Sequence, residues 1–298
     1  MQARSWRHEI FPDYKGKRSP PPEPLVESQP VIQELLDALG LPWVQITSIE
    51  ADDVIATLAT SGATAGLRTA IVSPDKDFQQ VRLACTGVAA RALQADACAL
   101  TLAQLLSPMV HLLRPTRRKR GVQPAAPLPD FEPFTEEDFR VSTGGLEPPQ
   151  VSCVECTAVA CPAPLTRCRA QFVDFLALVG DAVDNIPGVA GIGDQTAPAL
   201  LLQHGSMEGV LAAAAAGVIT PTRAAKAFAK PGAAESARMS AVIAKLVCNV
   251  DVPLLTKPVD EWRLRPPADG GEAALELMNR LEFGPLTRNR VMALFSPF

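Results

Sequence analysis

The sequence predicts an α/β fold, in which a parallel-sheet core is followed by an all-α domain built around a helix-hairpin-helix. In the first third of the chain, short strand-like apolar runs alternate with runs of helical spacing. Such alternation is typical of a parallel sheet covered by helices. Beyond Phe172 the apolar spacing is helical only, and the glycines Gly188, Gly191 and Gly193 separate two helical runs.

Composition limits the alternatives to a globular protein without a membrane segment. Of the 298 residues, 47% are hydrophobic and 20% are charged, and the net charge is −4. No apolar run reaches the ~18 residues that a membrane-spanning helix needs, and the start lacks the apolar stretch of a secretory signal. Seven cysteines, an odd number, favour reduced thiols and an intracellular setting over a disulfide framework.

The first 18 residues combine positive charge with aromatic side chains. Basic groups interleaved with aromatic rings suit single-stranded nucleic acid. A frayed, charged chain end is the simpler alternative. The proline-rich stretch from Ser19 to Pro24 is expected to end this segment. Its basic residues are Arg4, Arg7, Lys15, Lys17 and Arg18, and its aromatic residues are Trp6, His8, Phe11 and Tyr14.

The following residues repeat a helix-strand plan. The spacing predicts a helix over Val31–Leu39 that ends at Gly40, and then a short buried strand over Trp43–Ile46. The later elements are a helix at Val54–Ala59, a strand at Thr69–Val72, a helical turn with Phe78 and Val81, a strand at Thr86–Leu93 and a helix at Thr101–Leu106.

Acidic residues follow the predicted strands Trp43–Ile46 and Thr69–Val72 and return at the end of the helical run that begins at Phe172. Taken singly, each group is explained as a helix cap. Carboxyl ends of parallel strands meet at one edge, where so many carboxylates would repel one another unless cations neutralised them. Oxygen-only ligands favour Mg²⁺ or Mn²⁺, and two ions ~3.5–4 Å apart suit phosphodiester hydrolysis. The residues are Glu50, Asp52, Asp53, Asp75, Asp77, Asp181 and Asp184.

The glycine-rich turn predicts contact with a phosphate backbone. Gly188, Gly191 and Gly193 free backbone N–H groups, and Thr196 lies in the first turn of a helix that ends at Leu202. The helix start adds the positive end of its dipole. A tight turn with solvated caps is the alternative. Further helices are predicted at Met207–Ala216, Ala237–Val247 and Glu272–Phe283.

Four strings along nearly the whole chain resemble the 5′ nuclease family, which comprises flap endonucleases and the 5′–3′ exonuclease domain of bacterial DNA polymerase I. They are RHEIFPDYKGKR, EADDVIATLA, SPDKDFQQV and GDAVDNIPGVAGIG. The resemblance implies a PIN-like nuclease core over 1–113, a basic, proline-rich and cysteine-containing insertion over 114–169, and a helix-hairpin-helix domain over 170–298.

The resemblance also implies roles for single residues. The first metal site would use Glu50, Asp52 and Asp53, and the second Asp75, Asp77, Asp181 and Asp184. Arg7, Lys15 and Arg18 would be catalytic and contact the 5′ strand and the scissile phosphate. The DNA-binding residues would be Arg4, Tyr14, Gly188, Gly191, Gly193 and Thr196, with K⁺ at the hairpin.

The implied activity is that of a monomeric, Mg²⁺- or Mn²⁺-dependent 5′–3′ exonuclease and 5′-flap endonuclease of replication and repair. Its substrates would be DNA with 5′ flaps, nicks or free 5′ ends, and RNA–DNA primers, in a bacterial cytoplasm or a DNA-containing organelle. One alternative is a noncatalytic DNA junction-binding protein. A more distant one is a PIN-type ribonuclease, which would lack the helix-hairpin-helix.

The sequence departs from the family in two places. Family members begin with a strand that ends in aspartate and carry a second aspartate before the basic segment. Neither is present here, so we expect an N-terminally truncated chain with impaired catalysis. The hairpin helix has Gln195 and Ala199 where the family has lysines, which predicts weaker duplex binding with a flatter salt dependence.

Within the insertion, four cysteines follow the pattern C-x2-C-x4-C-x6-C. Zinc binding is one interpretation, and a flexible segment with incidental thiols is the other, favoured because prolines surround the second pair. The four residues are Cys153, Cys156, Cys161 and Cys168.

Overall fold

The structure is a computed structural model that divides into two compact units, each taken separately below. The smaller unit comprises Met1–Ala3, Ser19–Thr47 and Asp251–Phe298, and the larger one Arg4–Arg18 and Ser48–Val250. The residues that the structure describes are 4–81, 110–115, 131–133, 166–220, 222–258 and 267–293, with the single residues 135, 138, 140, 141, 143 and 261.

A sheet of three described strands lies in the larger unit, in the order β1, β2, β3. Strand β1 (Thr69–Val72) pairs in parallel with β2 (Val110–Pro115), which pairs antiparallel with β3 (Phe131–Pro133). The predicted strand Thr69–Val72 is confirmed. Strand β3 falls in a stretch that the sequence indicates as a loop, and its proline is tolerated because edge strands need fewer N–H donors.

Helix α3 (Ala51–Thr64) packs against β1 and is longer than the predicted helix Val54–Ala59. Its buried face is made of small residues, which lets it approach the sheet closely. The 3-10 turn η1 (Lys76–Phe78) follows β1 and brings Phe78 into the same core. This core consists of Ala56, Ala59, Ala63, Ile71, Phe78, Val81 and Leu246.

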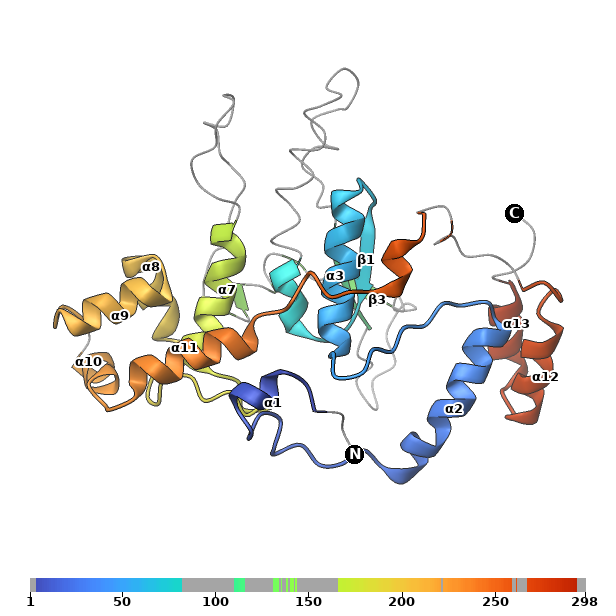
Figure 1. Ribbon diagram of the computed structural model, residues 1–298, viewed down its shortest axis with the longest axis horizontal. Coiled ribbons are helices and arrows are strands. Elements are labelled where there is room, and N and C mark those ends of the chain that lie inside the picture. Colours follow the sequence, from blue (N-terminus) through green and yellow to red (C-terminus); the bar gives the residue numbers. More distant parts are fainter. Residues whose placement is uncertain are drawn as a thin grey trace, which may run out of the picture. The chain divides into compact units, whose positions relative to one another are not determined.

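The described part of the larger unit also contains the short helix α1 (Arg7–Ile10) and five further helices that share a second apolar core. Helix α7 contacts α8, α9 and α11, and α10 contacts α9 and α11 (Figure 1). The helix predicted at Met207–Ala216 is confirmed to within one residue. The helices are α7 (Thr166–Val179), α8 (Ala197–His204), α9 (Met207–Ala215), α10 (Thr222–Phe228) and α11 (Ala233–Ala244).

Helix α11 ends before Val247, where the sequence places its end. Lys245 has extended backbone angles, and the N–H of Val247 donates to the Asp53 side chain at 2.9 Å instead of to a helical carbonyl. Tertiary contact therefore ends the helix three residues early.

The turn between α7 and α8 depends on two glycines whose backbones touch. Gly180 and Gly188 have φ values of +80° and +60°. A Cβ atom added at Gly188 would lie 2.5 Å from the Gly180 nitrogen. Asp181 and Ile186 form an antiparallel bridge within this turn. Thr196 occupies the N-cap position of α8 without a side-chain capping hydrogen bond, and Pro198 lies in the first turn, where proline is tolerated.

The smaller unit contains α2 (Glu23–Ala38), the 3-10 turn η2 (Pro253–Thr256), α12 (Glu272–Arg280) and α13 (Pro285–Ala293). Helix α2 begins eight residues before the predicted start at Val31 and ends one residue before the predicted end at Leu39. Its start lies inside the proline-rich stretch Ser19–Pro24, where Pro24 is tolerated because it lies in the first turn. Helices α2 and α12 contact each other, and Arg280 pairs with Glu34 at 3.0 Å.

The strand predicted at Trp43–Ile46 is wrong. These residues, which are described in full, pair with no strand. Trp43 is 40% exposed, and its indole N–H donates to Asp37 at 2.9 Å. A run of four apolar residues is too short to specify a partner strand, and here a side-chain contact to α2 holds it instead.

Three other sequence predictions lie outside the described residues: the strand Thr86–Leu93, the helix Thr101–Leu106, and the cysteine cluster, of which only the backbone of Cys168 is described. No helix in the described part of the chain is long and apolar enough to cross a membrane.

Candidate active site

Carboxylates from three segments of the larger unit come together. Glu50 and Asp52 lie at the start of α3, Asp75 and Asp77 at η1, and Asp184 in the turn after α7. Burial raises the pKa of Asp52, and the neighbouring Asp75 carboxylate raises it further. The convergence predicted from the sequence therefore brings like charges within electrostatic reach.

Of these carboxylates, Asp77 has the most strongly raised pKa. Burial raises its pKa to about 7, with further contributions from Asp75, Asp181 and Asp184, although Lys76 acts in the opposite direction. Its Oδ1 atom is buried and has no hydrogen-bond partner among the described residues. A buried oxygen that lacks a donor and is surrounded by negative charge is a suitable ligand for a cation.

Basic side chains from the N-terminal segment reach into the same place. The Lys15 ammonium lies 2.6 Å from Glu50 Oε2 and 3.8 Å from Asp184 Oδ2, and Arg18 also pairs with Asp184. Burial alone would raise the pKa of Glu50, but hydrogen bonds from Lys15 and Ser5 lower it overall. Lys15 and Arg18 thus lie beside the carboxylates, and their expected contact with the 5′ strand and the scissile phosphate stays a prediction.

Tyr14 anchors this segment in the helical core. Its ring is buried, and its hydroxyl lies 3.2 Å from Glu50 Oε2 and 3.3 Å from Asp184 Oδ2. The next residue, Lys15, has a φ of +55°, and its N–H donates to the Asp184 carbonyl at 2.9 Å. Tyr14 therefore holds Lys15 in place and leaves little of its own surface for DNA.

Arg7 and Asp53 differ from the sequence-based expectation, in which one contacts phosphate and the other binds metal. Arg7 is 2% exposed and Asp53 is 0% exposed. The guanidinium donates to both carboxylate oxygens, at 2.7 and 2.8 Å. Because both Asp53 oxygens are occupied and neither residue reaches solvent, they are interior groups.

Two participants have no role in the sequence-based assignment. Ser5 Oγ donates to Glu50 Oε1 at 2.6 Å. Lys76 Nζ lies 3.1 Å from Asp181 Oδ2, and Lys76, together with backbone N–H groups, lowers the pKa of Asp181 although burial alone would raise it. The signal for Lys76 is its place between two aspartates, whereas nothing in the sequence marks Ser5.

The donor chemistry of the site fits a hard divalent cation. Asp52, Asp75, Asp77 and Asp184 offer only oxygen atoms, which Mg²⁺ and Mn²⁺ prefer. Among the described residues no three acidic, cysteine or histidine side chains already form a ligand group. Lys15, Arg18 and Lys76 instead balance part of the charge.

The hairpin presents some of its predicted contacts to solvent and buries others. Gly188 is buried, and its N–H donates to Ser240 Oγ at 3.0 Å. Gly191 and Gly193 are exposed, and Thr196 is partly exposed. No described residue accepts a hydrogen bond from the N–H of Gly193 or Gln195. The exposed face before α8 can therefore bind an anion, while Gly188 has a structural role.

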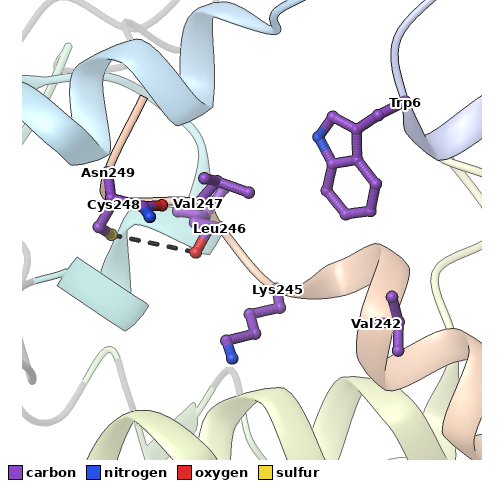
Figure 2. A pocket seen from close by; sticks show the side chains of 7 residues that line it. All are labelled: Trp6, Val242, Lys245, Leu246, Val247, Cys248 and Asn249. Carbon is purple, nitrogen blue, oxygen red and sulfur yellow. Dashed lines mark hydrogen bonds between the residues drawn. The ribbon is translucent and has the colours of Figure 1, made fainter. Parts of the chain in front are cut away.

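A separate pocket of about 500 Å³ lies beside Trp6 (Figure 2). Figure 2 shows the Trp6 indole on one side of the pocket and Leu246–Asn249, in the chain after α11, on the other side. None of the acidic residues lines it. Its lining residues are Trp6, Val242, Lys245, Leu246, Val247, Cys248 and Asn249.

Two family models match the chain. Residues 1–98 match the N-terminal resolvase-like domain of 5′–3′ exonucleases, and residues 168–269 match their C-terminal SAM fold. The two matches confirm the predicted fold class, a sheet-containing core followed by a helical domain.

Curated relatives agree with these models. The chain is 32% identical to a 5′–3′ exonuclease of Aquifex aeolicus, over 70% of this chain and 52% of the relative. It is 34% identical to DNA polymerase I of Bacillus caldotenax, over 70% of this chain and 17% of the relative. It is 31% identical to the flap endonuclease Xni of Serratia proteamaculans, over 70% of this chain and 60% of the relative. The chain thus spans less than two thirds of each of these relatives.

Among solved structures, the chain is similar to a bacteriophage T5 flap endonuclease in a complex with DNA and metal ions. The TM-score is 0.50 at 14% identity, over 98% of this chain and 79% of that chain. At this identity the likeness concerns the fold alone.

Proposed function

Because this chain belongs to the 5′–3′ exonuclease family, we propose that it hydrolyses DNA phosphodiester bonds as a metal-dependent 5′–3′ exonuclease and 5′-flap endonuclease. One observation carries the proposal: carboxylates from three segments converge beside Lys15 and Arg18. Negative groups that hold cations, next to positive groups that pair with phosphate, are the arrangement that phosphodiester hydrolysis requires.

The proposed ligands for divalent cations are Asp52, Asp75, Asp77 and Asp184, joined by Glu50 and Asp181 when their lysine partners turn away. Asp53 is excluded because Arg7 and Val247 occupy its oxygens. A bound Mg²⁺ or Mn²⁺ would neutralise phosphate charge and supply a nucleophilic hydroxide at neutral pH.

The chain's own cations would bind and orient the substrate. Lys15 and Arg18 can exchange their carboxylate partners for phosphate oxygens, since both prefer such anions. The exposed N–H groups of Gly193 and Gln195 would hold the duplex backbone, with K⁺ at this turn, while Gly191 and Thr196 flank them. Arg4 is exposed and would meet the 5′ strand.

The finer assignments belong to the same proposal. The substrates are DNA with 5′ flaps, nicks or free 5′ ends, and RNA–DNA primers, acted on by a monomer. The nuclease core spans 1–113, the insertion 114–169 and the helical domain 170–298. Support comes from the separate matches at residues 1–98 and 168–269, which leave the insertion between them.

A DNA junction-binding protein without catalysis is a second candidate function. It is favoured by the pairs that Lys15, Arg18 and Lys76 make with the carboxylates. These pairs already neutralise much of the negative charge, so the site is compatible with DNA binding in the absence of metal.

The test compares cleavage and binding of a 5′-flap DNA in Mg²⁺, Mn²⁺ and EDTA. We expect cleavage only with metal. The variant Asp75→Asn/Asp77→Asn should lose at least about a thousandfold in rate, because charge stabilisation at the reacting phosphate is lost. Its DNA affinity should stay within a few fold.

The control variant is Glu208→Gln, which removes an exposed carboxylate that pairs with Arg238 and should cleave normally. Undiminished cleavage by the double variant would contradict the metal-site assignment. Binding without any cleavage by the unaltered chain would favour the junction-binding function.

A further inference from the structure

We propose that Arg7 and Asp53 form a buried positioning pair, which holds the basic segment 4–18 against the acidic site and touches neither DNA nor metal. The inference rests on the proposed function for its kinetic consequences. Its structural part, the docking of segment 4–18, stands independently of any activity.

The Arg7 guanidinium makes four hydrogen bonds inside the protein. Nη1 and Nη2 donate to the two Asp53 oxygens, Nε donates to the Ile243 carbonyl at 2.8 Å, and Nη2 also donates to the Lys245 carbonyl at 3.0 Å. The Trp6 ring lies 4.5 Å from the guanidinium carbon. These bonds use four of the five guanidinium donors, and Nη1 also lies 3.7 Å from Glu50 Oε1. Because the side chain is 2% exposed, it offers no surface to a phosphate.

The Asp53 carboxylate joins the same segments from the other side. Besides Arg7, its Oδ1 atom accepts the N–H of Val247 at 2.9 Å, and the Trp6 indole nitrogen lies 3.4 Å from Oδ2. Figure 2 shows Trp6 and the chain at Lys245–Val247 on opposite sides of the pocket that this arrangement borders. One buried pair therefore connects the N-terminal segment, α3 and the chain after α11.

The position of the pair explains why it matters for the reaction. Asp53 lies within the first turn of α3, whose N-cap is Glu50. Ser5, two residues before Arg7, donates to one Glu50 oxygen, and Lys15, eight residues after it, lies against the other. A fixed Arg7 therefore helps to hold Ser5 and Lys15, the two residues that orient the Glu50 carboxylate.

A substrate-contacting role for Arg7, or a role of the pair in stability alone, would give different results. If Arg7 contacted the substrate, it would need exposed donors. If the pair served only stability, an apolar pair of similar volume could lower the free energy of unfolding, because the backbone groups of Ile243, Lys245 and Val247 lose their partners, but it would leave kcat of the folded protein unchanged. The double variant Arg7→Met/Asp53→Leu separates these cases, because it leaves no buried charge without a partner.

For this variant we expect kcat on a 5′-flap DNA to fall roughly a hundredfold, since small displacements of reacting groups cost about that much. KM should stay within about threefold, because the hairpin is untouched. Amide hydrogen exchange of residues 4–18 should accelerate at least about tenfold, while α7 and α9 keep their protection. The control Glu208→Leu/Arg238→Met removes an exposed ion pair and should leave kcat, KM and the hydrogen exchange of residues 4–18 unchanged.

Unchanged kcat and exchange would overturn the proposal, and so would a raised KM with kcat retained, which would place Arg7 on the substrate. If the unaltered chain cleaves no DNA with a 5′ end, the proposed function fails, yet exchange of residues 4–18 still decides the positioning role. If the double variant does not fold, the test uses Arg7→Lys instead. We then expect faster hydrogen exchange of residues 4–18, and unchanged exchange would contradict the positioning role of the Arg7–Asp53 pair.

Discussion

The hairpin and the acidic site belong to one compact unit, but different forces hold them. The hairpin packs Ile186, Val189 and Ile192 into an apolar core, and its backbone groups bond to one another, as in the Asp181–Ile186 bridge. The acidic site is held by ion pairs, and it retains a buried Asp77 oxygen without a donor among the described residues.

The difference shows where the chain is optimised for stability and where for chemistry. In the hairpin each local feature agrees with the fold, and a change there should cost stability. In the acidic site like charges are kept together against their repulsion, and a change there should gain stability while losing function. The following three predictions test this contrast.

The largest effect is expected at Gly188. A Cβ atom at this position would lie 2.5 Å from the Gly180 nitrogen and 2.6 Å from the Val179 carbonyl carbon, and φ is +60°. We expect Gly188→Ala to lower the free energy of unfolding by more than about 3 kcal/mol, since neither backbone can move freely. Urea unfolding at pH 7 measures the difference.

The matched control is Gly193→Ala, where an added Cβ atom meets nothing within 4 Å. It should change the free energy of unfolding by less than about 0.5 kcal/mol. Equal effects of the two alanines would show that the close approach of Gly180 and Gly188 does not stabilise the hairpin.

An intermediate effect of opposite sign is expected at Asp77. Its pKa in the folded protein is about 7, against 3.8 for the free group. Between these values the folded state binds more protons than the unfolded state, so this carboxyl destabilises the fold progressively from pH 4 to 7 and by a constant amount above. In EDTA, Asp77→Asn should therefore be more stable at pH 8, by about 2 to 4 kcal/mol.

The gap between Asp77→Asn and the unaltered protein should shrink as the pH falls from 7 to 5, which thermal unfolding at several pH values can follow. Glu208→Gln is the comparison, because Arg238 lowers the pKa of that exposed carboxylate. A gap that does not vary with pH would mean that Asp77 is not a repelled carboxylate.

The smallest effect concerns the exposed face of the hairpin. Gln195 and Ala199 are both exposed. Replacing both by lysine should steepen the dependence of log affinity on log salt by about two, and tighten duplex binding roughly tenfold at low salt. Gln203→Lys, an exposed position at the other end of α8, adds charge away from the exposed turn and should change the slope less. An unaltered slope for the double lysine variant would contradict backbone contact by the hairpin.

Local pattern made part of this architecture predictable. The strand Thr69–Val72 and the helix from Met207 follow from apolar spacing, and the glycine turn follows from residues that only a tight turn requires. Each of these inferences uses residues close to one another in the chain. The meeting of the acidic groups is different, because the prediction places Glu50 and Asp52 at the end of a strand that the structure does not contain at Trp43–Ile46.

What the sequence could not show depends on partners far along the chain. Arg7 is a plausible phosphate ligand until Asp53, Ile243 and Lys245 are seen around it. Helix α11 ends early because Val247 bonds to Asp53. Trp43–Ile46 has the composition of a strand but no strand beside it in the described chain.

Tyr14 also gives the protein a spectroscopic reporter. It is the sole tyrosine of the chain, and burial raises its pKa, with further contributions from Glu50 and Asp184. A phenolate would form in mild alkali only where the ring has left its core and reached water. The ultraviolet absorbance of ionised tyrosine therefore reports, without any label, how often segment 4–18 detaches from the acidic residues.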